Sequence, residues 1–103
     1  MVIEYVRYII TSERADAFVA DYAKAAEILQ RSPYCQTYEL AQCEEEGTSF
    51  ILRITWTSTK DHLEGFRKSA EFPAFFALVK PYFNEIKEMR HYVQTPVIGN
   101  GNG

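Results

Sequence analysis

The alternation of apolar and polar residues along the chain predicts four β-strands. The clearest is residues 49–57, where Phe50, Leu52, Ile54 and Trp56 would share one face. Three further stretches are rich in β-branched and aromatic residues and lack a Gly or Pro in their interior: residues 2–10, 34–43 and 85–93. The acidic segment with Gly47 between the second and third strands is typical of a solvated hairpin turn.

Helical spacing of apolar residues predicts helices in the two long connections. The first helix would begin at a cap formed by Thr11 and Ser12 and end near Gln30. The second connection is expected to form two short helices, residues 58–69 and 73–80. Ser58 and Asp61 have the spacing of a capping box. The apolar stripe of the last helix is Phe72, Phe75, Phe76 and Val79.

The resulting element order, βαββαβ, is typical of one fold class. It predicts an α+β, ferredoxin-like domain, with a four-stranded antiparallel sheet and helices on one face. A chain of 103 residues is long enough for one such domain and too short for two. We expect the domain to span residues 1–95 and to be followed by a flexible tail, residues 96–103.

The helices of such a fold leave the second face of the sheet uncovered. Residues 2–10 are apolar on both faces apart from Glu4 and Arg7, which indicates that both faces are covered. Arg7, Glu39 and Arg53 would intersperse charges among the apolar residues of the second face. A second copy of the chain could bury this face and pair the charges, so we predict a homodimer. The alternative is an open face of mixed polarity.

Composition narrows the classes of partner. Aromatic residues make up 15% of the chain, more than a small core requires, and this indicates a ligand pocket or a subunit interface. The net charge of −3 argues against nucleic-acid binding, which needs a basic surface. We expect no membrane partner, because no apolar run approaches the ~20 residues of a span and the first residues do not resemble a signal peptide.

The two cysteines also bear on the compartment. Cys35 and Cys43 fall on one predicted strand, about 26 Å apart at the usual rise per residue, so they cannot form a disulfide with each other. We expect free thiols and a cytoplasmic protein, with an intersubunit bridge as the remaining alternative.

The candidate chemistry lies where the third strand passes into the next helix. Trp56 could line a pocket or simply fill the core, and its N–H needs a partner in either case. His62 could point inward beneath Trp56, where a pKa of about 6.5 would suit proton transfer, or it could be a solvated residue at a helix start. For His91 we expect a strand-pairing or interface role. Neither histidine has an Asp, Glu or Cys at ligand spacing, so no metal site is predicted.

These residues resemble the antibiotic biosynthesis monooxygenase family of dimeric α+β barrels. The resemblance lies in a strand ending at Trp56, the break at Pro81, a last strand at 86–92, and the series Ser58, His62, Phe66, Ser69 and Phe72. It implies a pocket between helices and sheet, where an aromatic substrate deprotonated to its anion reacts directly with O₂. It also implies that no metal or flavin cofactor is needed.

The chain departs from the patterns of particular branches of that family. Some polyketide-oxidising members carry Asn and Tyr where this chain has Leu52 and His62. Haem-degrading members carry a His where this chain has Phe66, and an Asn in the first strand, which has none here. Many relatives have a His in place of Gly65.

We therefore predict a cofactor-independent monooxygenase that acts on a quinol-like or polycyclic aromatic molecule. His62 would accept a proton, and the predicted substrate-binding residues are Trp56, Phe66, Leu52, Phe76 and Tyr22. One alternative is a non-catalytic module on the same fold that binds an aromatic ligand or serves a stress response. Another is a haem-binding or haem-degrading protein with His62 or His91 as the axial ligand.

Overall fold

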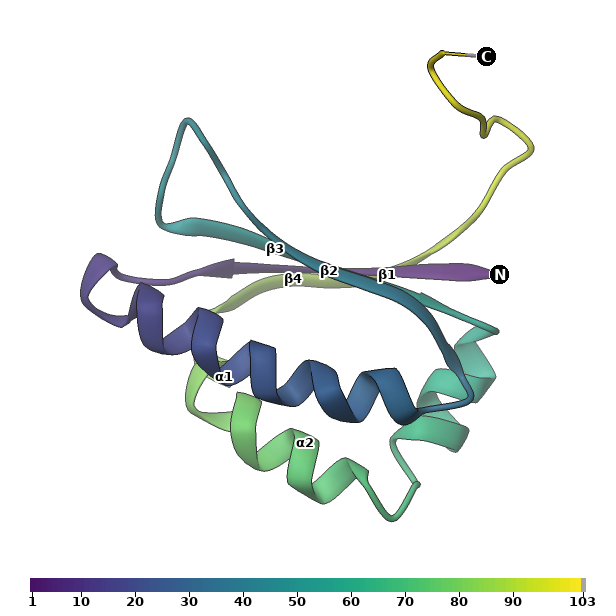
Figure 1. Cartoon of the computed structure of the whole chain (residues 1–103), viewed down its shortest axis with the longest axis horizontal. Helices are drawn as coiled ribbons and strands as arrows, with labels where there is room; N and C mark the ends of the chain where they lie inside the picture. The colour runs from purple at the N-terminus through teal and green to yellow at the C-terminus, as the bar shows by residue number, and fades with distance from the viewer. Residues whose placement is uncertain (103) are drawn as a thin grey trace.

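The strands and helices follow one another in the predicted order (Figure 1). A computed structural model describes residues 1–102, and Gly103, the end of the predicted tail, lies outside them. The elements are β1 (Val2–Ile9), α1 (Ser12–Arg31), β2 (Cys35–Gln42), β3 (Ser49–Trp56), the π-helical turn η1 (Asp61–Phe66), α2 (Phe72–Val79), the 3₁₀ segment η2 (Lys80–Glu85) and β4 (Ile86–Val93). Within the described residues, no helix is long and apolar enough to span a bilayer.

The four strands form one antiparallel sheet in the order β2-β3-β1-β4, so β1 lies in the interior. Both helices pack on the same side of it (Figure 1). The predicted ferredoxin-like α+β fold is thereby confirmed. The register places Glu4 of β1 opposite Ile54 of β3 on one side and opposite His91 of β4 on the other.

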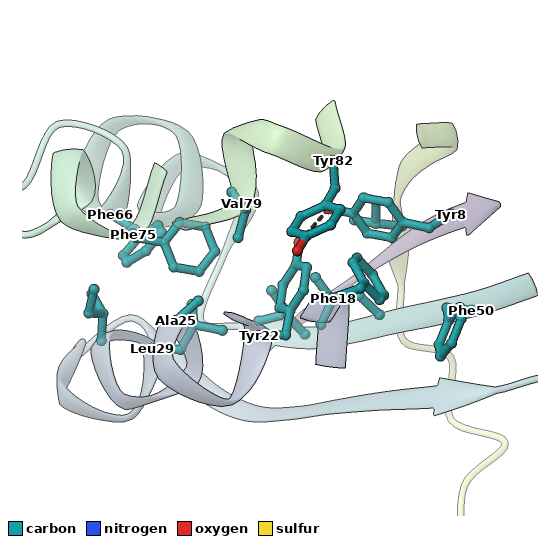
Figure 2. Close-up of a cluster of buried hydrophobic side chains, with 14 of the residues drawn as sticks. Tyr8, Phe18, Tyr22, Ala25, Leu29, Phe50, Phe66, Phe75, Val79 and Tyr82 are labelled. Carbon is teal, nitrogen blue, oxygen red and sulfur yellow. Dashed lines mark hydrogen bonds between the residues drawn. The ribbon is translucent and has the colours of Figure 1, made fainter. Parts of the chain in front are cut away.

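The core lies between the helices and the sheet and is largely aromatic (Figure 2). Phe18 of α1 is fully buried, and its ring meets those of Tyr8, Tyr22, Phe50 and Tyr82 edge-to-face, with centroids 4.9 to 5.1 Å apart. Burial of each such side chain contributes roughly 1.5–3 kcal/mol, so this cluster holds α1 firmly on the sheet.

The two predicted caps differ in outcome. The side chain of Thr11 makes no cap hydrogen bond, and the Arg14 N–H instead donates to the Thr11 carbonyl at 3.0 Å. Ser58 Oγ does accept from the Asp61 N–H, at 2.9 Å. The Asp61 carboxylate does not complete the capping box, because it accepts a hydrogen bond from the Thr57 hydroxyl at 2.5 Å instead.

The segment that Ser58 opens is a wide π-turn rather than the α-helix expected over residues 58–69. Its characteristic bond runs from the Arg67 N–H to the His62 carbonyl, at 3.1 Å. Gly65 lies inside the turn, where an added Cβ would come within 2.7 Å of the Tyr34 ring. Only glycine fits there without a shift of that ring, and the close packing fixes η1 against the start of β2.

Most side chains on the second face of the sheet are half-buried or exposed, and Thr55 and Ser49 of β3 are buried there. Ile3, Tyr5 and Arg7 of β1 are half-buried, and Arg53 donates to Glu39 at 3.2 Å. The tail from residue 94 to 102 contains no strand or helix and leaves the sheet on this side (Figure 1). Cys35 and Cys43 form no disulfide with each other within the chain.

Candidate functional site

A cavity of about 290 Å³ lies between the helix face of the sheet and the helices. All six residues predicted for the site line it: Tyr22, Leu52, Trp56, His62, Phe66 and Phe76. Its remaining lining is mostly aliphatic and aromatic, which suits an aromatic ligand. The polar side chains are confined to a few positions on its wall, and these determine its chemistry.

The first polar group is a buried carboxylate on β1. Glu4 is 3% exposed, and its Oε1 accepts a hydrogen bond from Trp56 Nε1 at 3.0 Å. This bond supplies the partner that the indole N–H requires. Burial raises the pKa of Glu4, while the Trp56 hydrogen bond and the nearby charge of Arg67 oppose the rise. Glu4 therefore holds a proton more readily than an exposed carboxylate.

The second polar group is His62, held flat against Trp56. The two rings stack with centroids 4.3 Å apart and an interplanar angle of 9°. His62 is 4% exposed, so it is not the solvated residue considered as an alternative. Burial, with smaller effects from the charge of Arg67 and from His91, lowers its pKa to about 3. At neutral pH the imidazole is uncharged.

His62 contacts a polar neighbour through each ring nitrogen. Its Nε2 lies 3.6 Å from Glu4 Oε1, and its Nδ1 lies 2.8 Å from Nε2 of His91. Because burial disfavours the charged forms of both Glu4 and His62, the first contact is a neutral imidazole facing a carboxyl group and not an ion pair. Glu4, His62 and His91 thus form a continuous polar row, which we call the Glu–His–His cluster.

His91 takes part in strand pairing, as predicted, while its interface role stays a prediction. Its position opposite Glu4 in the β1–β4 register puts its side chain on the helix face, where it bonds to His62. In the sequence no Asp, Glu or Cys lies at ligand spacing from either histidine, but the fold brings the Glu4 carboxylate beside them. One potential ligand atom from each of Glu4, His62 and His91 lies within 4.8 Å of the other two.

Sequence reasoning missed Glu4 as a site residue, and it gave His91 a place in a site only in the haem-binding alternative. One signal for Glu4 was available: it shares its strand face with Val2, Val6 and Tyr8, and a carboxylate on a buried face needs a specific partner. His91 gave no comparable signal, because only the strand register shows which side of the sheet it faces.

A pair of tyrosines on the cavity wall adds a further polar group. The hydroxyls of Tyr8 and Tyr22 are hydrogen-bonded to each other within the core (Figure 2). Burial raises the pKa of Tyr8 to about 12 and that of Tyr22 still further. Tyr22, predicted to contact a substrate oxygen, therefore presents a neutral phenol that already has one partner.

Comparisons with known proteins identify the family and the fold of the chain. The model of the antibiotic biosynthesis monooxygenase family matches residues 1–78, and the chain belongs to that family. The uncharacterised protein YczJ of Bacillus subtilis (strain 168) is 30% identical over 83 residues, which are 81% of this chain and 83% of YczJ.

Solved structures show the same fold. An antibiotic biosynthesis monooxygenase family protein of Bordetella bronchiseptica is 24% identical, with a TM-score of 0.79 over 91% of this chain and 96% of its own. A mutant form of SnoaB, a cofactor-independent oxygenase of Streptomyces nogalater, is 17% identical, with a TM-score of 0.74 over 94% of this chain and 97% of its own. At these identities the likeness concerns the fold alone.

Proposed function

We propose that this protein is a cofactor-independent monooxygenase that acts on a quinol-like or polycyclic aromatic molecule with O₂. The observation that carries the proposal is an aromatic-lined cavity with His62 buried in its wall between Glu4 and His91. Membership of the antibiotic biosynthesis monooxygenase family supports the same reaction class, and SnoaB, with the same fold, is itself a cofactor-independent oxygenase.

The proposed role of His62 is to accept the proton that the substrate loses. The imidazole is neutral at neutral pH, so a lone pair is available. The burial that keeps it neutral also makes it a weak base. The Glu4 carboxylate at 3.6 Å compensates by stabilising the imidazolium as it forms, and His91 holds the other side of the ring. The substrate anion then supplies the electrons for its reaction with O₂.

The cavity walls have two proposed roles. Trp56, Phe66, Phe76 and Leu52 form an apolar surface that holds a flat ring and excludes water, which strengthens the electrostatic interactions inside. Tyr22, from the helix that covers the cavity, offers a hydroxyl to a substrate oxygen. Phe66 packs on Trp56 with ring centroids 5.1 Å apart, so the two side chains act as one rigid wall.

Oxygen consumption tests this proposal. We expect purified, metal-free protein to consume O₂ with at least one member of a panel of hydroquinones and anthrone-type compounds. His62→Ala should lower the rate roughly 10²–10⁴-fold, the usual contribution of a positioned acid or base. The matched control is Leu63→Ala, in the same turn but pointing to solvent, which should keep the wild-type rate.

Other outcomes would replace the proposal. Full activity in His62→Ala would remove His62 as the proton acceptor. Ligand-induced shifts in melting temperature without turnover would favour the binding module. A Soret band on haem titration that is lost in His62→Ala or His91→Ala would favour a haem protein.

We also propose that the protein is a homodimer joined through the second face of the sheet. Half-buried apolar side chains on this face, including Ile3 and Tyr5, lie beside the Arg53–Glu39 pair, so a second copy would gain apolar burial without leaving these two charges unpaired. The free thiols at Cys35 and Cys43 favour a reducing compartment such as the cytoplasm.

The substitution Tyr5→Asp should break this dimer. Tyr5 packs edge-to-face on Tyr92, and an unpaired carboxylate in a buried interface costs several kcal/mol. Light scattering coupled to size exclusion should give a dimer for the wild type and a monomer for the variant. Lys24→Asp, on the exposed side of α1, is the control and should remain dimeric. A monomeric wild type would contradict the dimer.

A further inference from the structure

The Glu–His–His cluster has the composition of a transition-metal site. Two imidazoles and one carboxylate are a common ligand set for divalent first-row ions, and they leave other coordination positions open for water or substrate. The three residues come from β1, η1 and β4, and one ligand atom of each lies within 4.8 Å of the others. Three separate elements thus bring three metal-binding groups close together.

The separation of the two histidines suits a shared ion. Two ligands at about 2.0–2.1 Å from a metal are roughly 2.9 Å apart when they bind at right angles and roughly 3.3 Å apart in a tetrahedral site. His62 Nδ1 and His91 Nε2 are 2.8 Å apart. An ion could therefore replace the proton between them, provided that both imidazole rings turn so that their lone pairs point at the ion and not at each other. Glu4 Oε1 contacts the other nitrogen of His62, Nε2, at 3.6 Å, so the Glu4 carboxylate must swing round the edge of the imidazole to join an ion held at Nδ1.

The surroundings hold the ligands in place. Trp56 donates to the Glu4 carboxylate at 3.0 Å and stacks on the His62 ring, so one indole orients two of the three ligands. Glu4 and His62 both line the cavity, which gives a bound ion access to a ligand there. The charge of Arg67 nearby opposes a cation, and the charge of Glu4 offsets it.

We propose that Glu4, His62 and His91 bind one divalent first-row transition-metal ion, of the Zn²⁺ or Fe²⁺ class, at the edge of the cavity. This site goes beyond the proposed function and does not rest on it. A bound ion takes up a lone pair of His62, so metal-loaded protein lacks the free base of the metal-free oxygenase. Metal binding would thus inhibit the metal-free reaction.

Titration of tag-free, chelator-treated protein tests the site without any need for activity. Co²⁺ serves as the spectroscopic probe through its visible absorption bands, and Zn²⁺ is measured by calorimetry. We expect one ion per chain, a rise in melting temperature with Zn²⁺, and loss of these signals, or at least 100-fold weaker binding, in His91→Gln. Glu4→Gln should also weaken binding. Glu88→Gln, exposed on β4, is the control and should bind as the wild type does.

His91 is the most informative position, because it is only partly buried and its replacement leaves the Trp56–Glu4 bond in place. Circular dichroism checks that each variant is folded. The proposal is overturned if wild-type protein binds neither ion, or if His91→Gln binds as tightly as the wild type. Oxygen uptake by metal-free protein is read separately, so failure of the metal site and failure of the proposed function are distinguishable.

Discussion

Replacing Trp56 with alanine is expected to lower the free energy of unfolding by about 3–5 kcal/mol, the range for loss of a large buried aromatic side chain. Trp56 is 1% exposed and is among the largest fully buried side chains of the chain. Its ring stacks on the His62 ring and also packs against the Phe66 ring. Truncation at this position therefore leaves a void that neither neighbour can close without leaving its own place.

The indole N–H also donates a hydrogen bond to Glu4, and the estimate for loss of apolar burial does not include it. Without its N–H, the Glu4 carboxylate remains buried with no donor from β3, and an unsatisfied buried group of this kind costs a further ~1–3 kcal/mol. Trp56→Phe separates the two effects. It keeps much of the ring burial and removes the hydrogen bond. The free energy of unfolding should therefore fall less in Trp56→Phe than in Trp56→Ala.

Urea unfolding followed by far-ultraviolet circular dichroism measures both variants, since the chain has a single Trp and loses its fluorescence signal when that residue is replaced. Leu63→Ala provides the matched comparison, because this side chain belongs to the adjacent turn and is 38% exposed, so its loss should cost about 1 kcal/mol or less. A Trp56→Ala protein within about 1 kcal/mol of the wild type would contradict the packing described for the site.

The fold was predictable because its signals are local. The alternation at 49–57 and the helical spacing between Ala15 and Leu29 each depend on neighbouring residues, and the element order then specifies the sheet. The predicted side-chain cap at Thr11 is wrong, because residue type alone does not determine which hydrogen bond forms at a helix start. Residue type allows a side-chain cap, but a backbone bond from the Arg14 N–H to the Thr11 carbonyl forms there instead.

The site was only partly predictable because it is built across the sheet. Trp56, His62 and Phe66 lie close together in the sequence, so their spacing indicated a shared pocket. Glu4 and His91 join them only through the register of β1 with β3 and β4, which no short motif encodes. The resemblance to relatives with Asn at the position of Leu52 placed a polar residue of the cavity on β3. In this chain the carboxylate of the cavity belongs to Glu4 on β1.

The second large effect concerns the Tyr8–Tyr22 pair at high pH. Burial raises the pKa of Tyr8 from 10 to about 12, so the folded state holds this phenol proton more tightly than the unfolded chain does. The resulting stability is fully present below pH 10 and is lost as the pH rises from 10 towards 12. For Tyr8 alone the loss is about 3 kcal/mol, from two pKa units at about 1.4 kcal/mol each. Tyr22, whose pKa is raised further for the same reason, increases it.

The double variant Tyr8→Phe/Tyr22→Phe should therefore lose less stability than the wild type between pH 10 and pH 12. Replacing both partners together leaves no unpaired hydroxyl, so stability at pH 7 should change little. Tyr82 packs on the same Phe18 ring and donates a hydrogen bond to Asp21 at 2.5 Å. Burial raises the pKa of Tyr82 to about 12, so Tyr82 contributes equally to the alkaline loss of stability in the wild type and the double variant.

Chemical unfolding at a series of pH values, with refolding checked at each, measures this difference. Tyr5→Phe is the control: it removes one phenol from the second face of the sheet, outside the cluster around Phe18, and should reproduce the wild-type decline. Equal alkaline loss in the double variant and the wild type would show that the pair is ionised as easily in the folded core as in the open chain. The expected result would instead establish that the cavity wall keeps two phenols neutral, as donors to a bound oxygen anion must be.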